Sequence, residues 1–239
     1  MKELISSGLE ALGLTGSVPP DAAEKLAEYG RLLLEKNKVM NLTAIRDEAG
    51  VARLHMLDCA ALLPCADFSQ ARTLLDVGTG AGFPGLPLKI LLPQLDVTLL
   101  DSLNKRVDWL NEVSAQLGLI GVRAIQGRAE EKALDKSMRD SFDLVTARAV
   151  ADLRLLAELC LPYVKPGGLF LAMKSNKTDE EIEDSVRALK RAYDDYEALL
   201  YLQYEFMDDH RMIAPKVYRT TYSDGSVMTC DYNNFTYTL

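Results

Sequence analysis

The sequence lacks any long hydrophobic run. No stretch approaches the roughly 20 consecutive apolar residues that a membrane-spanning helix needs. The first eight residues include Glu3 and have no extended apolar core, so they do not have the pattern of a signal peptide or a membrane anchor. We therefore expect a cytoplasmic protein that makes no contact with a membrane.

Cysteine and histidine are also scarce. The cysteines form no C-x-x-C pair, are too sparse in a chain of 239 residues for a disulfide framework, and do not stand at metal-ligand spacing. They are Cys59, Cys65, Cys160 and Cys230. The two histidines are His55 and His210. These shortages predict reduced thiols and no structural or catalytic metal.

A basic excess is missing as well. The chain has 27 Lys and Arg residues against 35 Asp and Glu, a net charge of −8, which argues against tight nonspecific binding to nucleic acid. A local basic face is still compatible with this balance, because five basic residues gather in the N-terminal part. They are Arg31, Lys36, Lys38, Arg46 and Arg53. The alternative is a set of solvated helices with scattered charges, and a flat salt dependence of RNA affinity would favour it.

Two patterns of hydrophobic residues divide the sequence near residue 70. Before it, helical spacing predicts helices at Lys2–Leu12, Pro20–Lys38 and Asp47–Leu63. From Arg72 onwards, short apolar runs alternate with amphipathic stretches, which is typical of a parallel α/β sheet. The predicted strands are Thr73–Val77, Val97–Leu100, Val122–Ile125, Phe142–Thr146 and Leu169–Met173, and the clearest helices are Leu103–Leu117, Asp152–Leu161 and Thr178–Tyr193.

This division predicts a helical extension over residues 1–70 that packs on an α/β domain over residues 71–239, the two forming effectively one domain. The extension is too thin to hold a core of its own. Beyond Tyr196 the composition becomes strand-like again, and residues 223–226 offer a hairpin turn between two such segments.

The first predicted strand leads into a turn with three glycines. Gly78, Gly80 and Gly82 follow Asp76, and a short helix opens near Phe83. Glycines in such a turn let the backbone approach a ligand closely, although they can also serve chain geometry alone. A dinucleotide-binding fingerprint requires its third glycine at position 83, which is Phe83 here. The spacing therefore favours a ligand without phosphates over a diphosphate.

Two further segments lie at the same edge of the predicted sheet. Asp101 ends the second strand, where a carboxylate can accept hydrogen bonds from both hydroxyls of a ribose, or can cap the helix that follows. The third strand leads into residues 127–130, beside which an adenine ring would lie. Glu130 in that loop is otherwise a solvated first-turn residue. Nicotinamide dinucleotides and S-adenosylmethionine share the ribose, so Asp101 does not distinguish them.

These blocks resemble the bacterial 16S rRNA guanine-N7 methyltransferases, the RsmG or GidB family. The glycine turn with its following Phe-Pro-Gly and the Arg-Ala pair at residues 148–149 are the most specific matches. Other matching blocks are residues 41–43, 55–58, 101–106, 127–130, 142–145 and 165–168. The resemblance runs from about residue 20 to about residue 180.

The resemblance implies a Rossmann-like class I S-adenosylmethionine-dependent methyltransferase fold. Such a fold has a mostly parallel, seven-stranded sheet, here with an N-terminal helical extension. The implied substrate is 16S rRNA in the small ribosomal subunit, at N7 of the guanine at position 527 in the 530 loop. The residues implied to contact the cofactor are Gly78, Phe83, Ala129, Glu130 and Arg148, to which we add Gly80 from the same turn and Asp101 from the ribose argument.

The chemistry of N7 methylation needs no general base. The guanine N7 lone pair is nucleophilic and carries no proton, so the reaction mainly requires the two groups to be held close and aligned. Arg148, just past the fourth strand, is our candidate for orienting the base as well as contacting the cofactor. His55 and Asp58 stand at i, i+3 spacing on one helix face. They are either a buried hydrogen-bonded pair that fixes the extension or a direct substrate contact.

The C-terminal segment departs from the family. Residues 205–239 are acidic, whereas family members commonly end in a basic tail that contains proline, so the details of RNA engagement are open. One alternative function is methylation of another RNA site or of a small molecule. Another is a cofactor-binding factor in ribosome assembly. A nicotinamide-dependent dehydrogenase is disfavoured by Phe83. We expect a monomer, because no long apolar face is unexplained.

Overall fold

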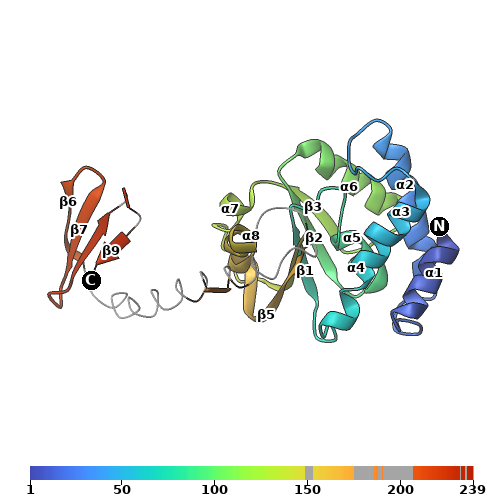
Figure 1. Cartoon of the computed structure of the whole chain (residues 1–239), viewed down its shortest axis with the longest axis horizontal. Helices are drawn as coiled ribbons and strands as arrows, with labels where there is room; N and C mark the ends of the chain where they lie inside the picture. The colour runs from blue at the N-terminus through green and yellow to red at the C-terminus, as the bar shows by residue number, and fades with distance from the viewer. Residues whose placement is uncertain are drawn as a thin grey trace. The chain divides into compact units, whose positions relative to one another are not determined.

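The computed structural model describes most of the chain. The described residues are 1–148, 153–174, 183, 186–187, 190, 207–231, 233–234 and 236–238. The chain divides into two compact units, Met1–Glu181 and Ile182–Leu239, which we describe separately (Figure 1). The helix predicted over Thr178–Tyr193 lies largely outside the described residues.

A parallel sheet forms the centre of the first unit. Its strands are β1 (Thr73–Val77), β2 (Asp96–Asp101), β3 (Val122–Gln126), β4 (Phe142–Arg148) and β5 (Val164–Met173). They are arranged in the order β3-β2-β1-β4-β5, and every neighbouring pair is parallel. The five predicted strands are confirmed. The direction of strand progression reverses between β1 and β4, the position where open α/β sheets bind ligands.

The three central strands, β1, β2 and β4, are buried on both faces of the sheet. Leu74 and Leu75 of β1 are both fully buried, yet they belong to different hydrophobic clusters, as side chains of successive strand residues point to opposite faces. The cluster around Leu74 includes Trp109 of α6 (Asn104–Gln116) and residues of α5 (Gly85–Leu91). The cluster around Leu75 includes Leu156 of α8 (Leu153–Cys160).

The N-terminal helices share the first of these clusters. Ile5, Leu26 and Leu33 are fully buried in the same core as Leu74 of the sheet. Figure 1 shows these helices packed along one side of the first unit, next to α5. They are α1 (Lys2–Ala11), α2 (Ala22–Asn37), α3 (Glu48–Val51), the π-helix η1 (Ala52–Leu57), α4 (Asp58–Ala60) and the 3-10 helix η2 (Leu63–Cys65). The predicted boundary at residue 70 therefore lies inside one continuous core, and the predicted division into domains stays a prediction.

The number of strands differs from the expected seven. Among the described residues the parallel sheet has five strands, and the segments after residue 206 form a separate antiparallel sheet in the second unit. Its strands are β6 (Met207–Ala214), β7 (Val217–Tyr222), β8 (Val227–Asp231) and β9 (Thr236–Thr238), in that order. Pro215 and Lys216 alone connect β6 to β7, which forces a hairpin, because parallel neighbours need a crossover of about a dozen residues or more.

The predicted hairpin turn is confirmed. Residues 223–226 connect β7 to β8, and Gly225 has a φ of +87°, a conformation that glycine adopts without strain. Asp224 accepts hydrogen bonds from the amide and the hydroxyl of Ser226 and stabilises the turn. Among the residues that the structure describes, no helix combines the length and apolar character needed to cross a bilayer.

Candidate functional site

The turn between β1 and α5 has the backbone conformation that its glycines allow. Gly78, Gly80 and Gly82 have φ values of +65°, +61° and +115°. A Cβ atom on Gly82 would also lie 2.7 Å from the hydroxyl of Tyr29 and 2.7 Å from a methyl group of Leu86. The first two glycines are thus required by backbone conformation, and the third by both conformation and space.

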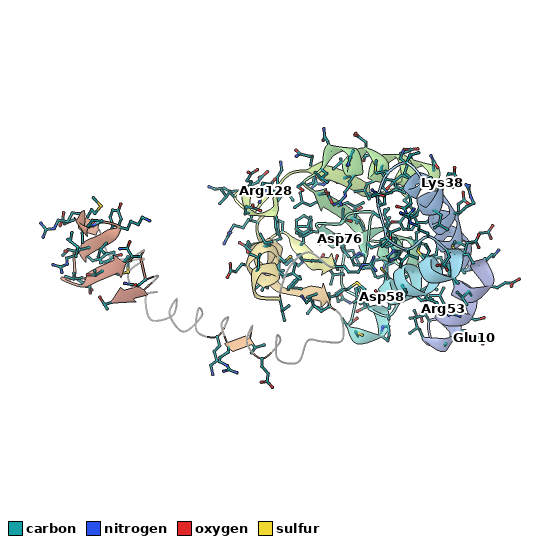
Figure 2. The ribbon with its side chains drawn as sticks, turned by 45° about the horizontal axis from the view of Figure 1, so that its top comes forward. Glu10, Lys38, Arg53, Asp58, Asp76 and Arg128 are labelled. Carbon is teal, nitrogen blue, oxygen red and sulfur yellow. The ribbon has the colours of Figure 1, made fainter. Side chains whose placement is uncertain are left out.

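Asp76 at the end of β1 holds the two sides of this turn together. Its carboxylate accepts hydrogen bonds from the hydroxyl of Thr79 (2.6 Å), the amide of Gly85 (3.0 Å) and the hydroxyl of Thr146 (2.9 Å). Burial raises the pKa of Asp76 to about 6, against the lowering effect of these bonds. Figure 2 shows Asp76 inside the first unit. Sequence reasoning identified Asp76 only as a strand end and missed this role.

Two helices fix the turn from the other side. The carbonyl of Ala81 accepts hydrogen bonds from the hydroxyl of Tyr29 (2.7 Å) and the indole nitrogen of Trp109 (3.2 Å). Tyr29 comes from α2 and Trp109 from α6. Tyr29 is fully buried, and burial raises the pKa of its phenol well above the usual value. The helical extension therefore contributes directly to the shape of the glycine turn.

Asp101 at the end of β2 faces the same turn. Its carboxylate accepts hydrogen bonds from the amides of Gly80 (2.9 Å) and Leu103 (2.9 Å), and Arg106 lies 3.3 Å away. The bond to Leu103 orders the backbone just before α6, but Asp101 does not cap this helix, because Leu103 is its N-cap residue and no side chain makes a capping hydrogen bond there. A carboxylate offers about four acceptor positions, so Asp101 retains capacity for a further donor. It is nearly fully buried, whereas Arg106 is partly exposed.

A cavity of about 350 Å³ opens beside Asp101, which is within the usual range for small-molecule sites. It brings together residues from the ends of β1, β2 and β3 and from the start of α7 (Ala129–Lys132). Four of the predicted cofactor residues line it: Gly78, Asp101, Ala129 and Glu130. Glu130 is exposed and accepts a hydrogen bond of 2.6 Å from Arg128, which Figure 2 shows at the periphery of the unit.

A second, smaller cavity of about 210 Å³ lies on the side of the turn that faces the helical extension. Gly78 and Arg106 line both cavities, so the two adjoin at the turn. The remaining predicted cofactor residues Gly80, Phe83 and Arg148 line this second cavity, together with His55. Leu42, Thr43, Thr79 and Ala81 complete its wall. The structure thus places the predicted cofactor residues around two adjoining cavities.

Arg148 links the sheet to the helical extension. Its guanidinium donates hydrogen bonds to the carbonyl of Leu54 (3.2 Å), to Nδ1 of His55 (2.9 Å) and to the carboxylate of Asp58 (3.3 Å). Its central carbon lies 4.8 Å from the centre of the Phe83 ring, in cation–π contact. Its side chain is only 16% exposed, so these contacts fix its position at the end of β4.

His55 lies in η1 and packs between these groups. Its ring stacks on Phe83 with 4.5 Å between centroids, and its Nε2 lies 2.8 Å from the hydroxyl oxygen of Thr43. Burial, and then the positive charge of Arg148, lower the pKa of His55 to about 4. Within the described part of the chain His55 and Asp58 do not bond to each other; both contact Arg148. The predicted link between His55 and Asp58 is therefore indirect and runs through Arg148.

The five basic residues of the N-terminal part differ in their surroundings. Three of them form ion pairs with glutamates: Arg31 with Glu28 (2.6 Å), Lys36 with Glu112 (2.6 Å) and Lys38 with Glu35 (2.7 Å). Arg46 and Arg53 form no ion pair with any residue that the structure describes. Figure 2 also shows Lys38 and Arg53 well apart. An RNA-binding face made by all five residues stays a prediction.

The described residues contain no group of three or more His, Cys, Asp and Glu side chains placed to hold a metal ion. All four cysteines lie within the described ranges and are free thiols. Burial raises the pKa of Cys160 to about 12, so this thiol is not poised for reaction as a thiolate.

The strand order, the glycine turn after β1 and the carboxylate at the end of β2 define a Rossmann-like α/β protein with the class I methyltransferase fold. The family model described as "GidB: rRNA small subunit methyltransferase G" matches residues 22–201. The chain belongs to this family, as its resemblance to RsmG and GidB predicted.

Several curated relatives named Ribosomal RNA small subunit methyltransferase G are similar over most of their length. The protein from Clostridium beijerinckii is 46% identical over 188 residues, which are 79% of this chain and 78% of the relative. The protein from Clostridium perfringens is 43% identical over 78% of this chain and 77% of the relative. The protein from Lachnoclostridium phytofermentans is 49% identical over 77% and 75%, respectively.

Proposed function

We propose that this protein transfers a methyl group from S-adenosylmethionine to N7 of a guanine in 16S rRNA. Membership of the GidB family supports methylation of small-subunit rRNA, and the resemblance to RsmG supports the N7 position. The observation that carries the proposal is the glycine turn bonded to Asp101 beside the larger cavity, in a chain of this family.

The larger cavity fits an adenosyl group. Its apolar wall of Val77, Leu100 and Leu159 suits a flat ring, and Asp101 retains acceptor capacity for a ribose hydroxyl. The position where a diphosphate-binding turn has its third glycine is Phe83, which suits a nucleoside without phosphates. The residues that would hold the cofactor are Gly78, Gly80, Phe83, Asp101, Ala129, Glu130 and Arg148. S-adenosylmethionine, when bound, supplies an electrophilic methyl group.

The chain's own residues contribute mainly by positioning. Guanine N7 carries no proton, so no side chain has to act as a general base, and alignment of the two reacting groups dominates the rate. Arg148 is held by Leu54, His55 and Asp58 before any ligand arrives, so it can orient the base without first being ordered. Phe83, stacked on His55, helps to exclude water from the smaller cavity.

The proposal extends to the protein's partners. We infer that the substrate is presented on the small ribosomal subunit or its precursor, and that Arg46 and Arg53 are the basic residues available for phosphate contacts. The protein would act in the cytoplasm as a monomer. The acidic residues 205–239 offer few phosphate contacts, so the first unit would provide most of the RNA interface.

The function is tested by transfer of labelled methyl groups from S-adenosylmethionine to small subunits that lack the modification. We expect a single N7-methylguanine in 16S rRNA, located by chemical cleavage at that base, and saturable binding of the cofactor in calorimetry. Transfer to another RNA site or to a small molecule would favour the second enzyme function. Cofactor binding without transfer to any subunit preparation would favour an assembly factor.

A further inference from the structure

The hydrogen bonds of His55 determine which of its ring nitrogens carries the proton. Arg148 can only donate, so Nδ1 of His55 accepts its hydrogen bond and has no proton. The low pKa of His55, about 4, keeps the ring neutral at physiological pH, which leaves the proton on Nε2. Nε2 therefore donates to the Thr43 hydroxyl oxygen 2.8 Å away.

The direction of this hydrogen bond limits what the Thr43 hydroxyl can still do. Its hydroxyl oxygen also accepts a hydrogen bond of 3.1 Å from the amide of Ile45, so both of its lone pairs are used. Only the O–H hydrogen is left, and among the described residues it has no acceptor. The side chain of Asn37 fixes the main chain of Thr43. Its Oδ1 accepts a hydrogen bond from the Thr43 main-chain amide (3.1 Å), and its Nδ2 donates one to the Thr43 main-chain carbonyl (2.9 Å). Thr43 lines the smaller cavity as an obligatory donor.

Most of the other charged or polar side chains of the cavity are hydrogen-bond donors as well. Arg106 and Arg148 can only donate, and both ring nitrogens of His55 are already engaged. Of the side-chain groups of this wall that can still bond a ligand, only the Thr79 hydroxyl oxygen can accept, because its hydrogen is donated to Asp76; Thr43, Arg106 and Arg148 are donors. They match a ligand edge that consists of acceptors.

We propose that Thr43 donates a hydrogen bond to O6 of the target guanine and that His55 positions it to do so; this inference rests on the proposed function. Guanine presents two acceptors, O6 and N7, on one edge, whereas adenine presents an amino group in place of O6. A donor at O6 aligns the base with N7 free for methylation. If an adenine occupied the site, the same donor would face its amino group, which offers no acceptor. The contact therefore discriminates against adenine.

The carboxylate of the cofactor's methionine moiety is the other group of acceptors that could occupy this wall. Two cations, Arg106 and Arg148, are the natural partners of a carboxylate, whereas Thr43 is neutral and comes from the helical extension. The two possibilities differ in a measurable way. A contact of Thr43 with the carboxylate would make the affinity for S-adenosylmethionine depend on Thr43, and a contact with O6 would not.

The test is a cycle that combines one change in the protein with one change in the base. Wild type and Thr43→Val are each assayed for methyl transfer to small subunits that carry either guanine or 2-aminopurine at the target position. The second base has N7 but no O6. We expect Thr43→Val to lower kcat/KM on guanine roughly ten-fold or more and to have no further effect on 2-aminopurine. Thr43→Ser, which keeps the hydroxyl, is the matched control and should retain most of the activity.

The outcomes distinguish a failure of the proposed function from a failure of the proposed contact between Thr43 and O6. If the wild type methylates no guanine in the subunit, the proposed function fails. If the wild type is active but Thr43→Val loses the same factor on both bases, Thr43 does not contact O6. A weaker affinity of Thr43→Val for S-adenosylmethionine in calorimetry would assign Thr43 to the cofactor instead. Should Thr43→Val not fold, Thr43→Cys, with its weak thiol donor, takes its place in the same cycle.

The positioning role of His55 has its own signature. Because the chain has only two histidines, nitrogen NMR of the imidazole rings is readily assigned with a His210→Asn variant. We expect His55 to be neutral with its proton on Nε2 at pH 7, and the Arg148→Lys variant to alter this signal. A proton on Nδ1 would reverse the direction of the bond to Thr43 and overturn the inference.

Discussion

At the scale of single residues, Arg148 is where the sheet and the helical extension meet. It contacts three residues of the extension and the ring of Phe83, so its role is structural as well as chemical. A lysine at this position keeps the charge but cannot make the same set of planar, forked contacts. The guanidinium geometry, and not the charge alone, is therefore what the site requires.

We predict that Arg148→Ala and Arg148→Lys both lower methyl transfer by about 100-fold, a loss typical of a misplaced reacting group. Arg148→Ala also leaves Nδ1 of the buried His55 without its donor, which should cost about 1–3 kcal/mol of unfolding free energy in urea denaturation. Arg139→Ala is the control and should change neither quantity, because Arg139 is exposed and, among the residues that the structure describes, forms an ion pair with Asp140 alone. Wild-type turnover in Arg148→Lys would show that charge alone suffices.

Asp76 is the second residue whose substitution is informative. Asp76→Ala leaves three donors without an acceptor, namely Thr79, Gly85 and Thr146, and should destabilise the protein by about 3 kcal/mol or more at pH 7. Asp76→Asn keeps an oxygen for the first two, and the hydroxyl of Thr146 can rotate to accept from the new amide. We therefore expect Asp76→Asn to be clearly more stable than Asp76→Ala. Equal stabilities would argue against the hydrogen-bonded clamp.

At the scale of elements, the glycine turn depends on backbone conformation more than on space at Gly80. A Cβ atom on Gly80 would contact only the Gly78 carbonyl, at 3.9 Å, so its φ of +61° is the main restriction. Gly118, after α6, has the same φ within one degree and nothing within 4 Å, which makes it a matched control outside the site.

We predict that Gly80→Ala and Gly118→Ala each destabilise the protein by about 1 kcal/mol, the usual penalty for a side chain in this conformation. Of these two variants, only Gly80→Ala should weaken binding of S-adenosylmethionine, since Gly80 donates its amide to Asp101 and Gly118 lies outside the site. Calorimetry and urea denaturation on the same preparations test both statements. A comparable loss of affinity in Gly118→Ala would show that the effect comes from stability and not from the turn.

The elements of the first unit could be predicted from hydrophobic period, but parts of the site could not. The strand Thr73–Val77 was predicted with its observed bounds, because a short apolar run that leads into a glycine turn is a clear strand signal. The helix predicted at Asp47–Leu63 instead contains the π-helix η1 and ends at Ala60, which period alone does not reveal. The contributions of Tyr29, Trp109 and Thr43 depend on contacts between distant segments, and nothing in their local sequence marks them.

At the scale of the whole molecule, two buried groups give opposite dependences of stability on pH. The folded pKa of His55, about 4, lies below the usual histidine value of 6.5, so the unfolded chain binds this proton first and stability is lost as pH falls from about 6.5 towards 4. The folded pKa of Asp76, about 6, lies above the usual aspartate value of 3.8, so the folded chain binds this proton first and stability is gained as pH falls from about 6 towards 3.8.

We predict that Asp76→Asn, which lacks the second contribution, loses stability more steeply than wild type as the pH is lowered from 7 to 4.5. The measurement is the free energy of unfolding by urea at several pH values in that interval. The variant His55→Gln should show the reverse, with a shallower loss than wild type. Parallel curves for wild type and Asp76→Asn would mean that Asp76 titrates near its unfolded value.

The two sheets of the chain also differ in how far apart in sequence their partners are. β1 pairs with β4 across about 70 residues, whereas the pairs of the antiparallel sheet, β6 with β7, β7 with β8 and β8 with β9, join strands that follow one another along the chain. Closing a long loop costs more conformational entropy than closing a short one, and many distant pairings slow folding. The antiparallel sheet, although synthesised last, can therefore form its strand pairs early. The pairing of β1 with β4 is slower, and it limits the rate at which the glycine turn acquires its final conformation.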